Sequence, residues 1–343
     1  MEHPGPDADL VAPFARLTQD RIREIAREVY GLEVIAISRL DTERDDSYAL
    51  ETAEGMRLIK VANPVDDPSV IDLSVQAMRH AFAQDATLPI PQVLPAIDGA
   101  LVTEVAGSLG EPRLSRLLTW LPGRVATNYR GSPKQSFARG HVLGRLSLAL
   151  SAFEHPGAQR VLAWDVQQLS SLRSLLSFVG DADIRDIIES HLDLFDAQIG
   201  PALAGSRQQV IHNDLNSENV LIDEADADVV AGVLDFGDIV YSAIVVDAGL
   251  AMSYVIETSG TASDAWYRPY QLAAGFTSVR PLTSDEQELL PDVVRSRLTQ
   301  RILVGSWLSA TNPVNAEYTS RTIESATAAL RLLHNTNPST VRL

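Results

Sequence analysis

The sequence predicts an α+β fold of two lobes, in which a small antiparallel sheet precedes a mainly helical region. Two observations predict it. Up to about Leu121, apolar side chains recur mostly at every second position, as they do in half-buried strands. From about Ser132 they recur at helical spacing instead. The length of 343 residues is also sufficient for two lobes of ~100–200 residues each.

The N-terminal lobe is expected to span residues 14–121, after a disordered leader over residues 1–13. The leader contains three prolines and lacks the basic start and apolar run of a signal peptide. A helix is predicted from Thr18, which can cap it, to about Tyr30, because Gly31 can end it. The other elements expected in this lobe are strands over 32–40, 47–52, 56–61, 101–105 and 115–121 and a helix over 70–82.

The C-terminal lobe is expected to span residues 124–343, beyond a break at Pro122-Gly123. Its predicted helices cover 133–153, 165–179, 183–199, 245–257, 262–276, 284–311 and 316–334. Short apolar strands are expected at 210–211, 220–222 and 229–234, where they flank polar segments. Polar residues at the ends of such strands are candidates for a functional site.

The composition excludes several classes of protein. Lys and Arg total 28 and Asp and Glu total 45, which gives a net charge of −17. Such a charge disfavours nucleic-acid partners and weakly favours cationic small ligands. The chain has no cysteine, which excludes disulfides and thiolate metal sites and fits a cytoplasmic location. No run of 18 apolar residues predicts a membrane span, and no pattern indicates the oligomeric state.

The strongest chemical signal is the segment His212-Asn-Asp214-Leu-Asn-Ser-Glu-Asn219, followed by Asp235-Phe-Gly-Asp238. This pattern suits phosphoryl transfer, in which an Asp orients the attacking hydroxyl and Asn and Asp oxygens bind Mg²⁺. Taken singly, Asp214 and Asn219 could cap turns and Asp235 could be an exposed carboxylate. The order of the two segments between apolar strands favours the catalytic interpretation.

Lys60 is the second signal. It is one of only two lysines, the other being Lys134, and it lies within the predicted apolar strand 56–61. A surface lysine would be the ordinary interpretation of one such residue. Its position upstream of the catalytic segments favours a lysine that binds phosphate.

With these segments the chain resembles the aminoglycoside phosphotransferase / choline kinase superfamily, whose bilobal fold is protein-kinase-like. It is most similar to the hydroxylysine kinase branch, which also occurs fused to class III aminotransferases. The resemblance extends from about Ile22 to Leu333. The segments that carry it are 44–48, 58–61, 117–123, 153–156, 160–165, 212–221 and 232–238.

The resemblance implies a role for each matching residue. Asp214 would be the catalytic base, with His212 supporting its loop, and Asn219 and Asp235 would bind Mg²⁺. Lys60 would hold the α and β phosphates of ATP. The segment 118–121 would be the hinge that offers backbone groups to adenine, within a boundary region at 117–123; its candidate cofactor residues are Leu118, Trp120 and Leu121. Asp247 would brace the catalytic loop, although a plain acid near a helix N-terminus is an equal alternative.

The segment expected to cover the phosphates departs from the family pattern. Residues 40–48 contain no glycine and four acids, which would repel a triphosphate unless they face solvent. Arg44 and backbone N–H groups, with Ser47 nearby, are left to hold phosphate. The carboxylate partner of Lys60 is also open, because Asp72 is the only carboxylate in the predicted helix 70–82 and Ser74 stands near the expected position.

We therefore expect an ATP- and Mg²⁺-dependent kinase that phosphorylates a small alcohol. A protein kinase is disfavoured because only 11 residues separate Asp235 from Asp247, too few for a long activation segment. An inactive kinase-fold binding module would be expected to have lost at least one of the four central residues, and all four are present: Lys60, Asp214, Asn219 and Asp235.

The substrate is expected to be a small molecule that carries an amine. A hydroxylysine-like amino alcohol is favoured, and an aminoglycoside, choline or ethanolamine, and homoserine are the alternatives. Five residues are candidates for substrate contact: Asp238, Tyr241, Trp266, Arg297 and Asn315. For Trp266 and Arg297, packing within the helical lobe is the better interpretation.

Overall fold

The computed structural model describes residues 14–40, 42, 45–129, 131–311 and 316–336. The described chain divides into two compact units. One comprises the residues up to Pro122 together with His155–Ala158, and the other comprises Gly123–Glu154 and the residues from Gln159 onward. The division therefore falls inside the segment 117–123, where the sequence predicts a hinge. The predicted leader and two candidate site residues, Arg44 and Asn315, lie outside the described residues.

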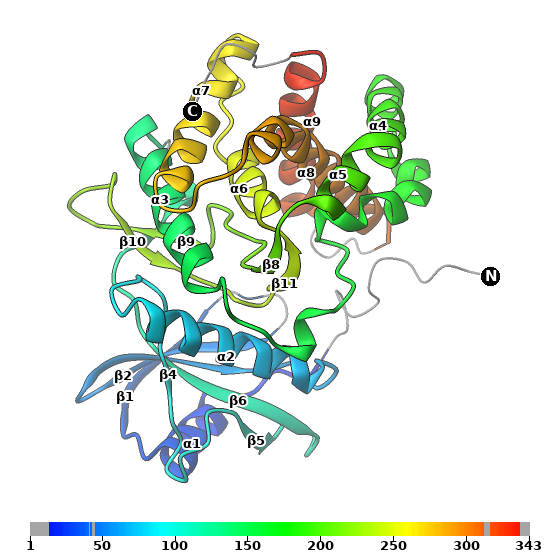
Figure 1. Cartoon of the computed structure of the whole chain (residues 1–343). Helices are drawn as coiled ribbons and strands as arrows, with labels where there is room; N and C mark the ends of the chain where they lie inside the picture. The colour runs from blue at the N-terminus through cyan, green and yellow to red at the C-terminus, as the bar shows by residue number, and fades with distance from the viewer. Residues whose placement is uncertain (1–13, 41, 43–44, 130, 312–315, 337–343) are drawn as a thin grey trace. The chain divides into compact units, whose positions relative to one another are not determined.

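The first unit is built on an antiparallel sheet (Figure 1). Its described strands follow the order β1-β2-β3-β6-β4. Strand β5 pairs with the first half of β6, whose second half pairs with β4. Strands β2 and β3 form a hairpin through a turn that ends at Gly55, whose φ of 106° suits glycine. The strands are β1 (Val34–Arg39), β2 (Asp46–Thr52), β3 (Gly55–Val61), β4 (Val93–Leu94), β5 (Thr103–Ala106) and β6 (Pro112–Thr119).

Helix α1 (Gln19–Tyr30) covers one face of this sheet with its apolar side. The Thr18 side chain accepts a hydrogen bond from the Arg21 N–H at the helix start, and Gly31 ends the helix with a φ of 67°. Both ends agree with the sequence-based prediction. Ile22 and Ile25 are buried with alternate residues of the strands, which form the core of the unit: Tyr48, Leu50, Ile59, Val61, Val105 and Leu117. The other set of alternate residues therefore lies on the opposite face of the sheet.

Helix α2 (Pro68–Gln84) completes the first unit. Asp67 caps its N-terminus, where Pro68 lacks an N–H that the helix would otherwise leave unsatisfied. The segment 155–158 packs on this helix, and His155 contacts Asp72. This unit thus includes four residues that come later in the sequence than the hinge segment.

The second unit is mainly helical and carries two small antiparallel sheets (Figure 1). Strand β9 pairs with β10 and β7, and β8 pairs with β11. The helices are α3 (Pro133–Ala149), α4 (Ala182–Leu194), α5 (Gly200–Gly205), α6 (Ile244–Ser253), α7 (Ala262–Thr277), α8 (Ser284–Thr311) and α9 (Ala316–Leu333), and the strands are β7 (Arg124–Val125), β8 (Gln208–Ile211), β9 (Val220–Ile222), β10 (Val230–Val233) and β11 (Val240–Ala243).

Two predicted helices of this unit differ in the structure. Residues Val166–Phe178 form a 3₁₀ helix, whose buried residues recur at every third position: Val166, Leu169, Leu172 and Leu175. Three residues per turn is the period of a 3₁₀ helix, so this spacing was the missed signal. The predicted helix 183–199 is α4 followed by a π-helical turn, Phe195–Ile199. Pro201, just beyond that turn, has no N–H with which to continue an α-helical ladder.

The short strands β4, β7 and β11 were not predicted, because two to four residues carry too little periodicity. No helix in the described ranges is long and apolar enough to cross a membrane.

Candidate active site

The catalytic segments lie at the ends of the short strands of the second unit. Asp214 lies three residues after β8, and Asn219 immediately precedes β9. Asp235 lies two residues after β10, which pairs with β9. The Leu234 N–H donates to the carbonyl oxygen of Asn219 at 2.8 Å and so ties the two segments together. The strands therefore bring together the residues that the sequence pattern singled out.

The loop after β8 depends on Asp247. Asn213 has a φ of 64°, an uncommon conformation for a residue with a side chain. The buried Asp247 carboxylate of α6 accepts hydrogen bonds from the N–H groups of Asn213 at 2.9 Å and His212 at 3.4 Å. Burial raises the pKa of Asp247 to about 6, although these two bonds oppose the rise. Asp247 thus braces the loop, as the resemblance implied.

His212 is buried beneath the same loop and is neutral. Burial lowers its pKa to about 4. Its Nε2 lies 3.1 Å from the carbonyl oxygen of Leu234, and its Nδ1 accepts from the Asp214 N–H at 3.3 Å. These partners require a proton on Nε2 and a lone pair on Nδ1. The imidazole therefore supports the backbone on both sides of the site. The Phe236 ring packs edge-on against it, with 5.1 Å between the two ring centroids.

The Asp214 carboxylate accepts hydrogen bonds from two amide side chains. Asn216 Nδ2 donates to both of its oxygens, at 3.1 and 3.0 Å, and Asn219 Nδ2 donates to Oδ2 at 2.7 Å. Burial raises the pKa of Asp214 well above its ordinary value, and the negative charge of Asp238 raises it further. Arg297 opposes this rise, and Asp235 adds to it. The side chain is 19% exposed, so a ligand can reach it.

Arg297 is the buried cation of this cluster, with 2% of its side chain exposed. Its Nη2 lies 3.5 Å from Asp214 Oδ1 and 3.1 Å from the Tyr254 hydroxyl. Its Nη1 donates to the Trp164 carbonyl oxygen at 2.9 Å and to Gln300 Oε1 at 2.7 Å. The guanidinium also stacks over the Trp164 ring at 4.9 Å. Arg297 is therefore packed within the helical lobe, which is the interpretation that the sequence analysis preferred. It also contacts Asp214.

Asn219 and Asp235 supply the oxygen donors that a hard cation such as Mg²⁺ requires. Asp235 is exposed and has a φ of 54°, and its Oδ1 accepts from the Gly237 N–H at 3.0 Å. Among the described residues no group of three or more His, Cys, Asp or Glu side chains is arranged to hold a metal. One carboxylate and one carboxamide fit Mg²⁺ when phosphate oxygens complete the coordination. The site has three carboxylates, those of Asp214, Asp235 and Asp238, and one arginine, Arg297, so its net charge is negative.

The other substrate candidates differ in their surroundings. Asp238 is half-buried, and its charge acts on Asp214. Tyr241 is 41% exposed on β11. Trp266 is 2% exposed within the helical core, where its Nε1 donates to Thr336 Oγ1 at 3.2 Å. Trp266 therefore packs within the helical lobe, which is the interpretation preferred for it, and it is not available for substrate contact.

Lys60 of the first unit pairs with Asp45, not with Asp72. The distance from Lys60 Nζ to Asp45 Oδ2 is 3.0 Å. Asp72 instead pairs with His155 at 3.0 Å and accepts a hydrogen bond from Gln76. The partner of Lys60, which the sequence left open, is therefore Asp45 and not the carboxylate of helix α2. The physical reason is register: Ser47 lies directly opposite Lys60 in the β2–β3 pair, so the residues just before β2 reach the lysine.

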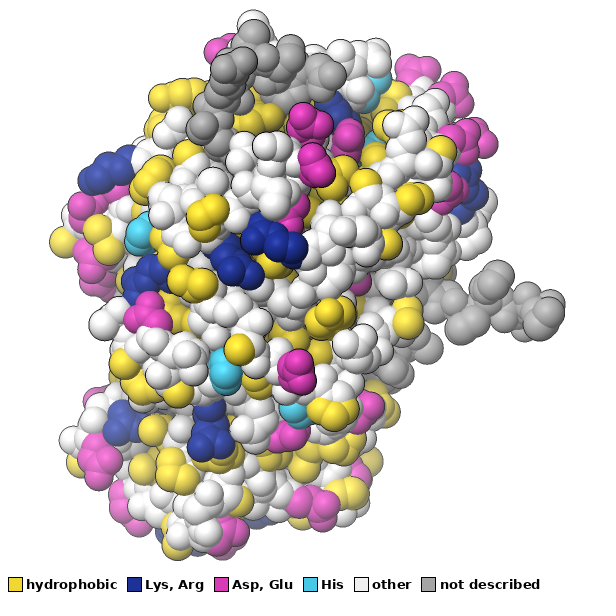
Figure 2. Space-filling model, in the orientation of Figure 1, with side chains coloured by type: hydrophobic (Ala, Val, Ile, Leu, Met, Phe, Trp, Pro, Cys, Tyr) yellow, Lys and Arg dark blue, Asp and Glu magenta, His cyan; other side chains and the backbone are white. Residues whose placement is uncertain are grey.

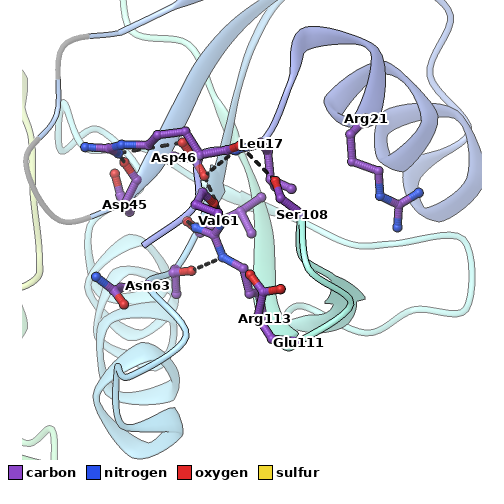
Figure 3. Close-up of polar contacts among 12 residues, drawn as sticks. Leu17, Arg21, Asp45, Asp46, Val61, Asn63, Ser108, Glu111 and Arg113 are labelled. Carbon is purple, nitrogen blue, oxygen red and sulfur yellow. Dashed lines mark hydrogen bonds and ion pairs between the residues drawn. The ribbon is translucent and has the colours of Figure 1, made fainter. Parts of the chain in front are cut away.

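Of the four acids in the segment 40–48, Asp41 and Glu43 lie outside the described residues, whereas Asp45 and Asp46 are buried and paired with cations and do not face solvent. The side chain of Asp46 is fully buried. Its Oδ2 lies 2.8 Å from Arg113 Nη1 and also accepts a hydrogen bond from the Leu17 N–H (Figure 3). Burial opposes ionisation of Asp45, yet Lys60 and then Arg116 hold its pKa below its ordinary value. Ser47 donates to Asp45 Oδ1 at 2.8 Å.

The hinge candidates lie at the end of β6. Leu118 is buried within the strand, whereas Trp120 is 39% exposed and Leu121 is half-buried beyond it. The sequence-based reasoning did not single out Arg113 or Arg116, two arginines of the same strand that meet Asp46 and Asp45. A signal was available for Arg116, which lies inside the predicted strand 115–121, since a charged residue in a strand requires a counter-charge when it is buried. Arg113 lies before that predicted strand and carried no such signal.

The acidic charge of the protein is not concentrated on the face that Figure 2 shows. Acidic side chains are scattered over it, with Lys and Arg side chains between them. The net charge of −17 therefore gives little direction to a cationic ligand on this face.

The chain is similar to known proteins over most of its length. A model of the phosphotransferase enzyme family matches residues 37–282. The chain is 25% identical over 313 residues to a hydroxylysine kinase of Danio rerio, and the alignment covers 88% of this chain and 87% of that protein. It is 23% identical over 313 residues to a homoserine kinase of Agrobacterium fabrum, with 89% of this chain and 90% of that protein covered.

Solved structures show the same fold at low sequence identity. Amicoumacin kinase hAmiN, in complex with AMP-PNP, Ca²⁺ and Ami, has a TM-score of 0.68 at 15% identity, covering 91% of this chain and 94% of its own. A microcompartment-associated aminopropanol kinase has a TM-score of 0.64 at 20% identity, covering 91% and 95%. These similarities establish the expected kinase-like α+β fold.

Proposed function

Because this chain belongs to the phosphotransferase enzyme family and is a small-molecule kinase acting on a hydroxyl, we propose that it uses ATP and Mg²⁺ to phosphorylate an amine-bearing alcohol. A hydroxylysine-like amino acid is the favoured substrate. The observation that carries this choice is the negative charge of Asp238 beside Asp214. The similarity to proteins named hydroxylysine kinase and homoserine kinase supports it, since both names denote hydroxy amino acids.

Asp214 is the general base of the proposed reaction. Its carboxylate orients the substrate hydroxyl and accepts its proton as the oxygen attacks the γ-phosphorus. The raised pKa of Asp214 increases its ability to accept that proton. Asn216, Asn219 and Arg297 hold the carboxylate in one orientation, which lowers the entropic cost of reaching the reactive arrangement.

Asn219 and Asp235 are the proposed Mg²⁺ ligands, and Lys60 is proposed to hold the phosphates of ATP. Bound Mg²⁺ supplies a positive charge that neutralises phosphate oxygens. The chain contributes one anionic and one neutral oxygen ligand. Leu118, Trp120 and Leu121 are proposed to contact adenine, with the segment 118–121 offering backbone hydrogen bonds.

Asp238 is proposed to bind the ammonium group of the substrate. A cation placed beside Asp238 would relieve the repulsion between this carboxylate and Asp214. A substrate without an amine would leave that repulsion in place. Discrimination against such substrates should therefore be strong.

The test is a comparison of kcat/KM for 5-hydroxylysine, homoserine, choline, an aminoglycoside and neutral sugars, with ATP and Mg²⁺. We expect the hydroxy amino acids to give the highest values. If neutral sugars or simple diols give the highest values, amine recognition is refuted while the phosphotransferase activity stands.

A matched variant tests the role of Asp238. Asp238→Asn should lower kcat/KM for the amine-bearing substrate by about tenfold to a hundredfold, the scale of a lost charged hydrogen bond. Its effect on any neutral alcohol that reacts should be smaller. Glu224→Asn removes the same charge from an exposed turn of the same unit and should change neither value.

A further inference from the structure

A row of polar side chains crosses three adjacent strands of the first unit. The strand registers place Ser47 of β2 opposite Lys60 of β3, and Lys60 opposite Arg116 of β6. Directly paired residues point to the same face of a sheet. This face is opposite to the one that α1 covers, because Tyr48, Ile59 and Leu117 alternate with the row and lie in the core.

The row contains two cations, and within the described part of the chain one carboxylate, that of Asp45, meets both of them. Asp45 Oδ2 lies 3.0 Å from Lys60 Nζ and 3.7 Å from Arg116 Nη2. The side chains of Lys60, Asp45 and Arg116 are only 14%, 11% and 9% exposed. These three residues together therefore carry one positive charge that is largely removed from water.

Arg116 also has an unsatisfied donor. Its Nη1 is buried and has no hydrogen-bond partner within the described part of the chain. A buried guanidinium nitrogen without an acceptor is costly. Structures retain such groups when a ligand or another partner supplies the acceptor. An anionic oxygen placed beside Lys60 would supply one here.

An apolar row lies next to the polar row on the same face. Ala49, Leu58 and Leu118 are paired across the same three strands. In each strand the apolar residue lies two positions along the chain from the residue of the polar row. Two residues of a strand span about 6.6 Å. This face thus carries buried or half-buried apolar side chains beside cationic ones, an arrangement that suits a molecule with a planar base at one end and phosphates at the other.

We infer that Arg116 is a second phosphate-binding residue of the nucleotide site, which binds the polyphosphate together with Lys60 while Asp45 holds both cations in place. This inference rests on the proposed use of ATP. It gives a site with a glycine-free phosphate loop a second cation with which to bind a triphosphate. The planar fork of arginine can bind two phosphate oxygens, whereas lysine acts as a point charge.

The test is the affinity of Arg116→Gln for ATP, inorganic tripolyphosphate and adenosine, measured by calorimetric titration without the alcohol substrate. We expect ATP and tripolyphosphate to bind about tenfold to a hundredfold more weakly than to the wild-type chain. Adenosine should bind equally to both, since it has no phosphate. Tripolyphosphate affinity equal to that of the wild-type chain would overturn the inference.

Two further variants distinguish a direct contact from a general loss of positive charge. Arg57→Gln removes the same charge from the other face of β3, where Arg57 pairs with Glu54, and should leave tripolyphosphate affinity unchanged. Arg116→Lys keeps the charge but not the fork and should recover only part of the affinity. If Arg116→Gln does not fold, full affinity in Arg116→Lys would refute the contact of the arginine fork with two phosphate oxygens. If the wild-type chain binds neither ATP nor adenosine, the proposed function itself fails.

Discussion

Asp214 is held by donors from three parts of the chain. Asn216 comes from its own loop, Asn219 from the start of β9 and Arg297 from α8. Two carboxylates, Asp235 and Asp238, oppose its ionisation together with burial. Such a residue is oriented and is also a better proton acceptor than an exposed aspartate. This combination is the reason to assign the base to Asp214 rather than to its acidic neighbours.

Asp214→Asn should lower kcat by about 10²–10⁴-fold, the usual contribution of a general base. The amide keeps the shape and can still contact Asn216 and Asn219, but it accepts no proton. Binding of ATP should be nearly unchanged. Steady-state kinetics with nucleotide titration measures both. The control is Glu224→Gln, an exposed acid of the same unit, and a kcat of Asp214→Asn close to that of the control would remove this residue from the mechanism.

Helices α3 and α7 approach each other through glycines. A Cβ added at Gly140 would lie 1.8 Å from the carbonyl oxygen of Leu272, and one added at Gly275 would lie 2.0 Å from that of Phe137. At Gly144 the corresponding contact, with the carbonyl oxygen of Phe276, is 2.6 Å. All three obstacles are backbone atoms, so the two helices must separate to admit a side chain.

Gly140→Ala should reduce the free energy of unfolding by about 1–3 kcal/mol or more, the cost of overpacking a close contact. The intrinsic preference of alanine for a helix opposes this loss by only about 1 kcal/mol. Gly205→Ala is the matched control, because Gly205 ends helix α5 with open space around its Cα. Urea denaturation compares the two, and equal stability of both variants would show that α3 and α7 tolerate wider spacing.

At the scale of the whole molecule, the buried histidine His191 is expected to contribute to the response of stability to acid. Burial, and then the charge of Arg295, lowers the pKa of His191 to about 4 from its ordinary value of 6.5. His191 of α4 hydrogen-bonds Ser296 of α8 at 2.9 Å. Below pH 6.5 the unfolded chain binds a proton that the folded chain does not. The contribution of neutral His191 to the free energy of unfolding is therefore fully present above pH 6.5 and is lost as the pH falls toward 4.

The wild-type chain should lose about 2 kcal/mol more stability between pH 7 and pH 5 than His191→Gln, which cannot titrate. The comparison uses urea denaturation at the two pH values. His141→Gln, at a half-buried position on α3, serves as the control and should follow the wild-type chain. If His191→Gln also follows the wild-type chain, another group dominates the acid response.

Local patterns predicted much of the molecule. Thr18 and Gly31 predicted both ends of α1, because caps depend on neighbouring residues. Asp214, Asn219 and Asp235 were predicted together because apolar strands flank them closely in the sequence. The 3₁₀ helix 166–178 was missed because its period of three was interpreted as part of an α-helical stripe. Strand β11 was missed because four residues carry little periodicity, although its pairing with β8 supports the loop that holds Asp214.

The sequence by itself determined the fold class, through the change of apolar spacing along the chain, and the phosphotransferase chemistry, through the resemblance that short segments carry. It also predicted the residues of a catalytic loop, because these lie close together in the sequence. The tertiary structure alone decided which charges meet. Asp45, rather than Asp72, is paired with Lys60, and Arg297 reaches Asp214 across 83 residues of sequence. The physical reason is that an ion pair requires two side chains a few ångströms apart. Strand register and helix packing set that distance, and no local pattern in the sequence records it.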